Sequence, residues 1–125
     1  MTILGLDHLV LTVASIDRTC EFYERVLGMR RETFAGGRSA LKFGTQKINL
    51  HEAGKELDPH ALHATPGSGD LCFIVDDLAA AQARLDAEGV VVIEGPAART
   101  GAIGAMMSIY CRDPDGNLIE LSQYR

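Results

Sequence analysis

The sequence predicts an α+β fold in which two βαβββ repeats form a curved eight-stranded mixed sheet with the helices on its outside. The first observation is an internal repeat: LDHLVLTVASI at residues 6–16 aligns without gaps to SGDLCFIVDDL at residues 68–78, at an offset of 62. The second is that each half reads as a strand, a helix and further strands. Units of this size cannot each cover their own sheet well, which favours one paired domain over two independent small ones.

The first repeat covers about residues 4–53. Residues 6–13 are rich in leucine and β-branched residues and predict a strand. Ser15 and Asp17 are helix-start signals, and Gly28 ends a stretch with apolar residues at helical spacing. Three further strands are expected, separated by Gly-containing turns, at residues 30–34, 39–43 and 47–51.

A Pro- and Gly-rich segment at about residues 54–68 predicts a linker, and the second repeat covers about residues 69–125. Residues 70–75 predict a strand, Asp76 and Asp77 a helix cap, and Gly89 the end of that helix. The remaining strands of this repeat are expected at residues 90–93, 106–111 and 118–123.

The last two strands form a hairpin around Asp113-Pro114-Asp115-Gly116, which has the residues that tight turns require. Glu120 then follows in a strand, among apolar neighbours. Burying an isolated charge is prohibitive, so Glu120 either lies in water on an edge strand or has a partner brought by the rest of the chain.

Composition excludes several classes of function. A net charge of −5 without a run of Lys or Arg argues against nucleic acid and anionic membranes as partners. Cys20, Cys72 and Cys111 are scattered and odd in number, which indicates a reducing compartment. The chain start lacks a signal-peptide pattern, and no apolar run is long enough to span a membrane. We expect a cytoplasmic protein.

Residues on four strands could supply metal ligands. His8 lies on the first strand, Asp70 takes the matching place in the second repeat, and Glu120 lies on the last strand. On the fourth strand Asn49 and His51 point to the same side, because side chains alternate along a strand. If the first and last strands of the repeats face one another, up to two imidazoles and two carboxylates converge. Such a set suits Zn, Ni, Mn, Fe or Co better than calcium.

The chain resembles the vicinal-oxygen-chelate superfamily, which includes glyoxalase I, fosfomycin-resistance proteins, extradiol dioxygenases and bleomycin-binding proteins. It is most similar to the small glyoxalase-domain-containing proteins. The resemblance covers essentially the whole chain and is carried by LDHLVLTV, FYERVLGM, KFGTQKINLHEAGKE and SIYCRDPDGNLIELS. The FY…VLG and DPDGN-x-IE patterns are fairly specific together. The resemblance implies the paired βαβββ fold.

The resemblance implies His8 and Glu120 as metal ligands, since both match the family's pattern cleanly. Two positions depart from it. Asp70 stands where glyoxalase I commonly has a histidine, and Asn49 stands where it has a glutamate, with His51 two residues on. The expected ligands are therefore His8, His51, Asp70 and Glu120, with Asn49 as an alternative. Each of these side chains could instead have no metal-binding role and simply be hydrogen-bonded within the protein or solvated.

The function implied is that of a metal-dependent lyase or isomerase of the glyoxalase I type, acting on a small substrate with adjacent oxygens, such as a thiol conjugate. Glu120 is the expected general base, with Asp70 as the alternative. Arg38, Lys42 and Arg99 are candidates for binding an anionic part of the substrate. A metal-dependent transferase or dioxygenase, and a non-catalytic drug- or metabolite-binding resistance protein, remain open. Exposed sheet edges favour a homodimer.

Overall fold

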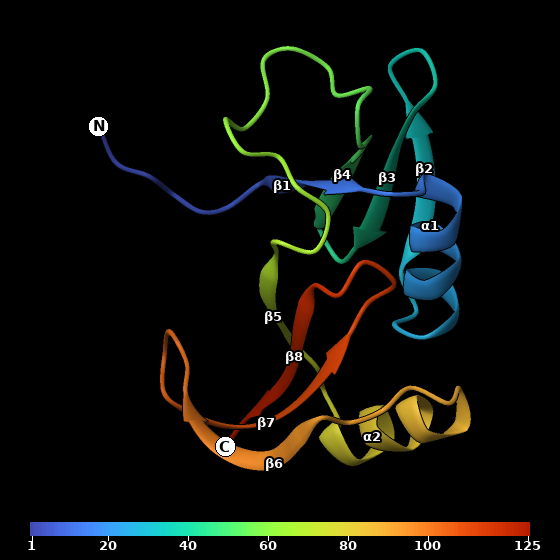
Figure 1. Ribbon diagram of the computed structural model, residues 1–125. Coiled ribbons are helices and arrows are strands. Elements are labelled where there is room, and N and C mark those ends of the chain that lie inside the picture. Colours follow the sequence, from blue (N-terminus) through green and yellow to red (C-terminus); the bar gives the residue numbers. More distant parts are fainter. The chain divides into compact units, whose positions relative to one another are not determined.

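The computed structural model describes residues 1–125, and the chain divides into two compact units, residues 1–68 and 69–125. Each unit is a βαβββ repeat with one four-stranded mixed sheet and one helix (Figure 1). The predicted α+β class and the two repeats are confirmed. The eight strands are hydrogen-bonded as two sheets of four, one in each unit.

The first unit contains β1 (His8–Val13), α1 (Ile16–Arg25), β2 (Arg30–Phe34), β3 (Arg38–Phe43) and β4 (Gln46–Glu52). Its strand order is β1-β4-β3-β2, and β1 runs parallel to β4 while the other neighbours are antiparallel. The first and last strands of the unit are therefore direct neighbours, and their side chains share the two faces of the sheet.

The helix α1 begins where the sequence predicted. The Ser15 side chain accepts a hydrogen bond from the backbone N–H of Arg18 at 3.2 Å, and Gly28 has a φ of +69° just beyond the last turn. The helix contacts β2, β3 and β4. The apolar core of this unit comes from the alternate strand residues on one face and from the buried side of α1, and includes Leu11, Val13, Leu41, Ile48, Leu50, Cys20 and Tyr23.

The second unit contains β5 (Asp70–Ile74), α2 (Leu78–Ala87), β6 (Glu94–Thr100), β7 (Ala105–Arg112) and β8 (Leu118–Tyr124). Its order is β5-β8-β7-β6, with β5 parallel to β8, so the topology of the first unit is repeated. Asp77 caps α2 by accepting a hydrogen bond from the N–H of Ala80 at 3.0 Å. Neither α1 nor α2 is long and apolar enough to cross a membrane.

The second strand of this unit lies at Glu94–Thr100, and the prediction of a strand at residues 90–93 was wrong. The apolar run Val90-Val91-Val92-Ile93 suggested a strand, but the strand follows it and contains Gly95-Pro96. Proline is tolerated on an edge strand or at a bulge, and β6 has both features. It lies at the edge of the sheet, and its pairing with β7 shifts register between Glu94 and Ala97.

The turn between β7 and β8 is organised by Asp113, which is buried. One carboxylate oxygen of Asp113 accepts hydrogen bonds from the backbone N–H groups of Asp115 and Asn117, at 2.9 and 3.0 Å. The Asn117 side chain in turn accepts a hydrogen bond from the N–H of Gly69 at 2.7 Å. The predicted hairpin is confirmed, and its turn also fixes the chain just before β5.

Candidate metal and substrate site

One face of the first sheet is apolar and meets α1, and the opposite face carries polar side chains from β1 and β4. In the register of these strands Val10 pairs with Asn49, and Thr12 pairs with His51. Because side chains alternate, His8 shares this face with Asn49 and His51. The expectation that Asn49 and His51 point the same way is confirmed.

His51 is buried without hydrogen-bond partners. Its side chain is 7% exposed, and neither Nδ1 nor Nε2 is hydrogen-bonded. The neighbouring Asn49 is 4% exposed, and its Oδ1 also lacks a partner. A buried polar atom without a partner costs about 1–3 kcal/mol, so such groups are rare and require a reason. A role of the imidazole nitrogen and the amide oxygen in binding a ligand would be such a reason.

His8 lies at the start of β1 and is exposed. Its Nδ1 is 2.8 Å from Oδ1 of Asp7, and this hydrogen bond is the main cause that lowers the pKa of Asp7. Metal-binding histidines commonly engage a carboxylate through one ring nitrogen and the metal through the other. The pair with Asp7 engages only Nδ1 of His8.

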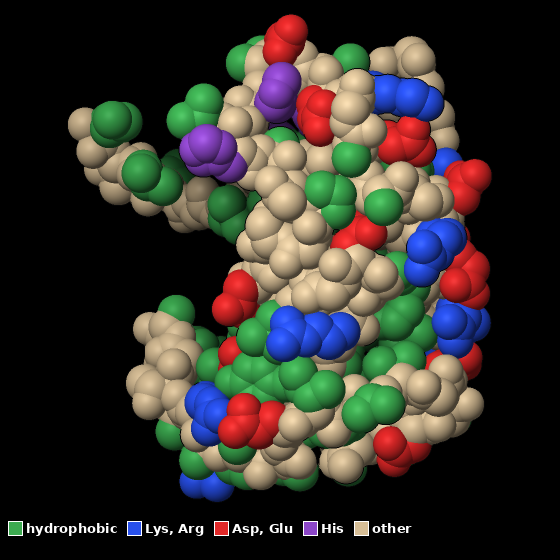
Figure 2. Space-filling model, viewed as in Figure 1, with side chains coloured by type: hydrophobic (Ala, Val, Ile, Leu, Met, Phe, Trp, Pro, Cys, Tyr) green, Lys and Arg blue, Asp and Glu red, His purple; other side chains and the backbone are tan.

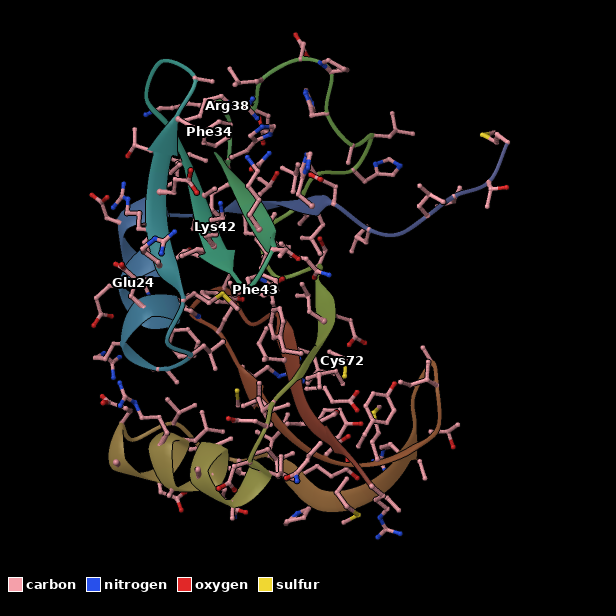
Figure 3. The ribbon with its side chains drawn as sticks, turned by 180° about the vertical axis from the view of Figure 1, so that it is seen from behind. Glu24, Phe34, Arg38, Lys42, Phe43 and Cys72 are labelled. Atoms are coloured by element: carbon pink, nitrogen blue, oxygen red, sulfur yellow. The ribbon has the colours of Figure 1, made fainter.

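A cavity of about 440 Å³ opens over this face. It is lined by residues of the sheet and of the loop after β4, among them His8, Asn49, His51, Phe34, Arg38 and Lys47. Of the three predicted substrate-binding cations, Arg38 lies in this cavity. Lys42 does not line it, and pairs with Glu32 at 3.9 Å. Figure 3 shows Arg38 beside Phe34, with Lys42 farther along β3.

The loop histidines lie on another side of His51. Figure 2 shows histidine side chains, in purple, on the visible surface. His60 and His63 line a smaller cavity of about 170 Å³ together with His51. Nδ1 of His60 is 3.1 Å from Oδ1 of Asp58, so this imidazole already has a carboxylate partner.

In the second unit Glu120 is held by two buried serines. The hydroxyl of Ser108 donates to Oε2 of Glu120 at 2.6 Å, and that of Ser122 donates to the same oxygen at 3.0 Å. The two hydroxyl oxygens are 2.7 Å apart, and both serine side chains are fully buried. The serines thus orient the carboxylate through one oxygen and leave Oε1 on the other side.

Further polar side chains lie on the Glu120 face. Asp70 is exposed at the start of β5, on the same face of the sheet as Cys72 and Glu120. Tyr110 pairs with Glu120 across β7 and β8, and its hydroxyl accepts a hydrogen bond from Nε of Arg99 at 2.9 Å. Burial is the main cause that raises the pKa of Tyr110. Arg99, the third predicted substrate cation, is thus already engaged, and it also lies 3.4 Å from Glu94.

A family model for the "Glyoxalase/Bleomycin resistance protein/Dioxygenase superfamily" matches residues 5–121. The chain belongs to this superfamily.

Curated relatives of this glyoxalase-superfamily protein match most or all of the chain. It is 55% identical to glyoxalase domain-containing protein RDO1 of Mycosarcoma maydis, over 100% of this chain and 71% of that protein. It is 54% identical to virulence protein STM3117 of Salmonella typhimurium, over 99% and 87%. It is 31% identical to a lactoylglutathione lyase of Pseudomonas aeruginosa, over 94% and 81%.

Solved structures agree with this assignment. An integron cassette protein from V. Cholerae has a TM-score of 0.98 and 56% identity, covering 100% of this chain and 98% of that one. TnmS3, an antibiotic binding protein from a Streptomyces species, has a TM-score of 0.79 and 25% identity, covering 100% and 99%. The superfamily protein therefore shares its fold with relatives whose names describe an enzyme and a binding protein.

Within neither unit do three or more His, Cys, Asp or Glu side chains gather as a metal cluster. The four predicted ligands divide equally, with His8 and His51 in the first unit and Asp70 and Glu120 in the second. Sequence reasoning missed Lys47 and the two serines. The period-two alternation of β4 places Lys47 on the face of His51, but only the cross-strand register reveals that Ser108 lies opposite Ser122.

Proposed function

We propose that this superfamily member is a metal-dependent lyase or isomerase of the glyoxalase I type, acting on a small molecule with two adjacent oxygens, such as a thiol conjugate. The observation that carries the proposal is His51, whose two buried ring nitrogens have no partner on the face that also bears His8. The 31% identity to a lactoylglutathione lyase over most of both chains supports the reaction class.

The proposed ligands of a divalent metal are His8, His51, Asp70 and Glu120, with Asn49 as the alternative to His51. Their chemistry fits Zn, Ni, Mn, Fe or Co, which accept mixed nitrogen and oxygen ligands. When bound, such a cation acts as a Lewis acid that chelates two adjacent substrate oxygens and stabilises negative charge on them. Asp7 fixes the ring of His8, and the two serines fix the carboxylate of Glu120.

We assign the proton transfer at the carbon next to these oxygens to Glu120, with Asp70 as the alternative base. The serines hold Oε2 of Glu120, so Oε1 is the oxygen that would bind the metal and, once detached from it, accept the proton. Burial of Ser108 and Ser122 keeps water from replacing them. A carboxylate held in this way loses little freedom when it acts, which is the benefit of preorganisation.

The proposal is tested by elemental analysis of protein purified without added metal, followed by a metal-dependent activity screen over 2-oxoaldehyde–thiol adducts, epoxides and catechols. We expect a stoichiometric divalent metal in the wild type and its loss in the His8→Ala, Glu120→Gln double variant. His63→Ala is the matched control, since it removes an exposed imidazole that is not a proposed ligand. Full metal occupancy in the double variant would refute the ligand assignment.

A non-catalytic binding protein is the second candidate. The similarity to the antibiotic binding protein TnmS3 over the full chain favours it, as does the open cavity over the polar face of the first sheet. Such a protein would retain the cavity without needing a metal. A folded protein that contains no metal, and gains no activity when metal is added, would support this second function over the first.

We also propose that the protein forms a homodimer. The strands β1 and β5 each have one unpaired edge, and unpaired edges tend to bind other chains. Before β1, the side chains of Ile3, Leu4 and Leu6 are 84%, 95% and 65% exposed, an apolar segment that a second copy could cover. Sedimentation equilibrium decides the point, and a mass of 13.5 kDa at all concentrations would exclude the dimer.

A further inference from the structure

Two cations that line the cavity of the first unit form no close ion pair. Arg38 and Lys47 take part in none of the ion pairs of the structure, whereas the neighbouring Lys42 is paired with Glu32. Both lie on the polar face of the sheet, on β3 and β4, and both are only partly exposed. Partly buried charges without counterions are unfavourable unless something else compensates them.

Both cations are held by the same aromatic ring. The guanidinium carbon of Arg38 is 4.9 Å from the centroid of the Phe34 ring, and Nζ of Lys47 is 3.7 Å from it. The buried Ala40, whose register partner on β4 is Asn49, leaves room on this face for long neighbouring side chains. A cation–π contact fixes a cation but supplies no formal negative charge. Asp7 interacts electrostatically with Lys47, but it is exposed, is hydrogen-bonded to His8 and does not line the cavity.

The pair opens into the cavity that His8, Asn49 and His51 also line. The cavity thus has a cationic part at Arg38 and Lys47, an apolar wall at Phe34, and the unpartnered polar atoms of Asn49 and His51. Its one acidic lining residue, Asp58, is exposed and faces His60 at 3.1 Å. Among the lining residues the two cations therefore outnumber the one carboxylate.

We propose that Arg38 and Lys47 form an oxyanion-binding site for a carboxylate, phosphate or phosphonate group of the substrate. The planar guanidinium suits two oxygens of one group, and the ammonium adds a third contact. The inference rests on the proposed function only for the other end of the substrate, whose adjacent oxygens would lie toward His8 and His51. Binding of the anion itself requires no metal.

The test titrates the metal-free 125-residue protein with inorganic phosphate or with lactate, and binding is followed by ¹H–¹⁵N NMR. We expect binding that perturbs β3 and β4, and no binding of methyl lactate, the neutral ester. Arg38→Gln and Lys47→Gln should each weaken binding about tenfold or more, because each removes hydrogen bonds to a charged group. Lys42→Gln is the matched control, with the same loss of charge beside the site, and should bind like the wild type.

Each outcome decides the proposal. Binding of phosphate alone assigns a phosphorylated or phosphonate substrate, and binding of lactate alone a carboxylate. If neither probe binds, or if Lys42→Gln weakens binding as much as Arg38→Gln, the site is overturned. Arg38→Lys keeps the positive charge, so it distinguishes loss of the charge from a general disruption of the fold. It should weaken binding less than Arg38→Gln. A negative result for anion binding would not affect the proposed metal ligands. Equally, the finding that the protein binds no metal would not affect the proposed anion site.

Discussion

Removal of the Ser108 hydroxyl should lower the free energy of unfolding by more than the loss of so small a group would suggest. In a Ser108→Ala variant Oε2 of Glu120 loses a hydrogen bond of 2.6 Å, and the hydroxyl of Ser122 loses a neighbour at 2.7 Å. Hydrogen bonds to charged groups contribute about 1.5–3 kcal/mol. Glu120 is partly exposed, so water replaces some of this, and we expect a loss near the lower limit of that range.

The assay is urea unfolding of the metal-free protein, followed by metal titration. The free energy of unfolding should fall in Ser108→Ala, and metal affinity should fall about 10–100-fold, as is usual when the partner of a ligand is removed. Ser39→Ala is the matched control, because this serine is also buried but its hydroxyl has only a 3.4 Å contact with Arg31.

A double-mutant cycle with Glu120→Gln isolates the contribution of the carboxylate charge. Ser108→Ala should cost less in the Glu120→Gln background than in the wild type, because the charged acceptor is already gone. Equal costs in both backgrounds, together with unchanged metal affinity, would refute the idea that the serines orient the carboxylate.

Two further predictions concern buried groups. His51→Leu should raise the free energy of unfolding of the metal-free protein by about 1 kcal/mol, because it removes ring nitrogens that lack partners, and should lower metal occupancy. Burial, assisted by Asp113, raises the pKa of the Cys111 thiol from 9.0 to about 11. Between these values the unfolded thiol releases its proton while the native one keeps it, so stability falls with rising pH by at most about 1.4 kcal/mol per unit.

Each of these has a simple check. If the metal-free His51→Leu variant is less stable than the metal-free wild type, the imidazole is a packed core group and not a metal ligand. For the thiol, a Cys111→Ala variant should show a flatter decline in unfolding free energy above pH 9 than the wild type. Parallel curves for the two proteins would contradict the assignment of the decline to Cys111.

Much of the fold could be predicted because its signals are local. Ser15 and Asp77 cap the helices where they were expected to, and the Asp113 turn closes the predicted hairpin. The strand β6 could not be placed in this way. Whether Gly95-Pro96 is tolerated depends on β6 being the edge strand with a bulge, which is a property of the sheet and not of the segment.

The sequence by itself determined the repeat, the turn chemistry and the side of each strand on which His8, His51 and Glu120 lie. These follow from periodicity, since a strand alternates its side chains wherever it is placed. Tertiary structure decided which charges have partners. Lys42 forms an ion pair with Glu32, and Arg99 donates a hydrogen bond to Tyr110. Arg38 and Lys47 both contact the Phe34 ring. Such pairings depend on register between strands distant in sequence, and no local pattern encodes them.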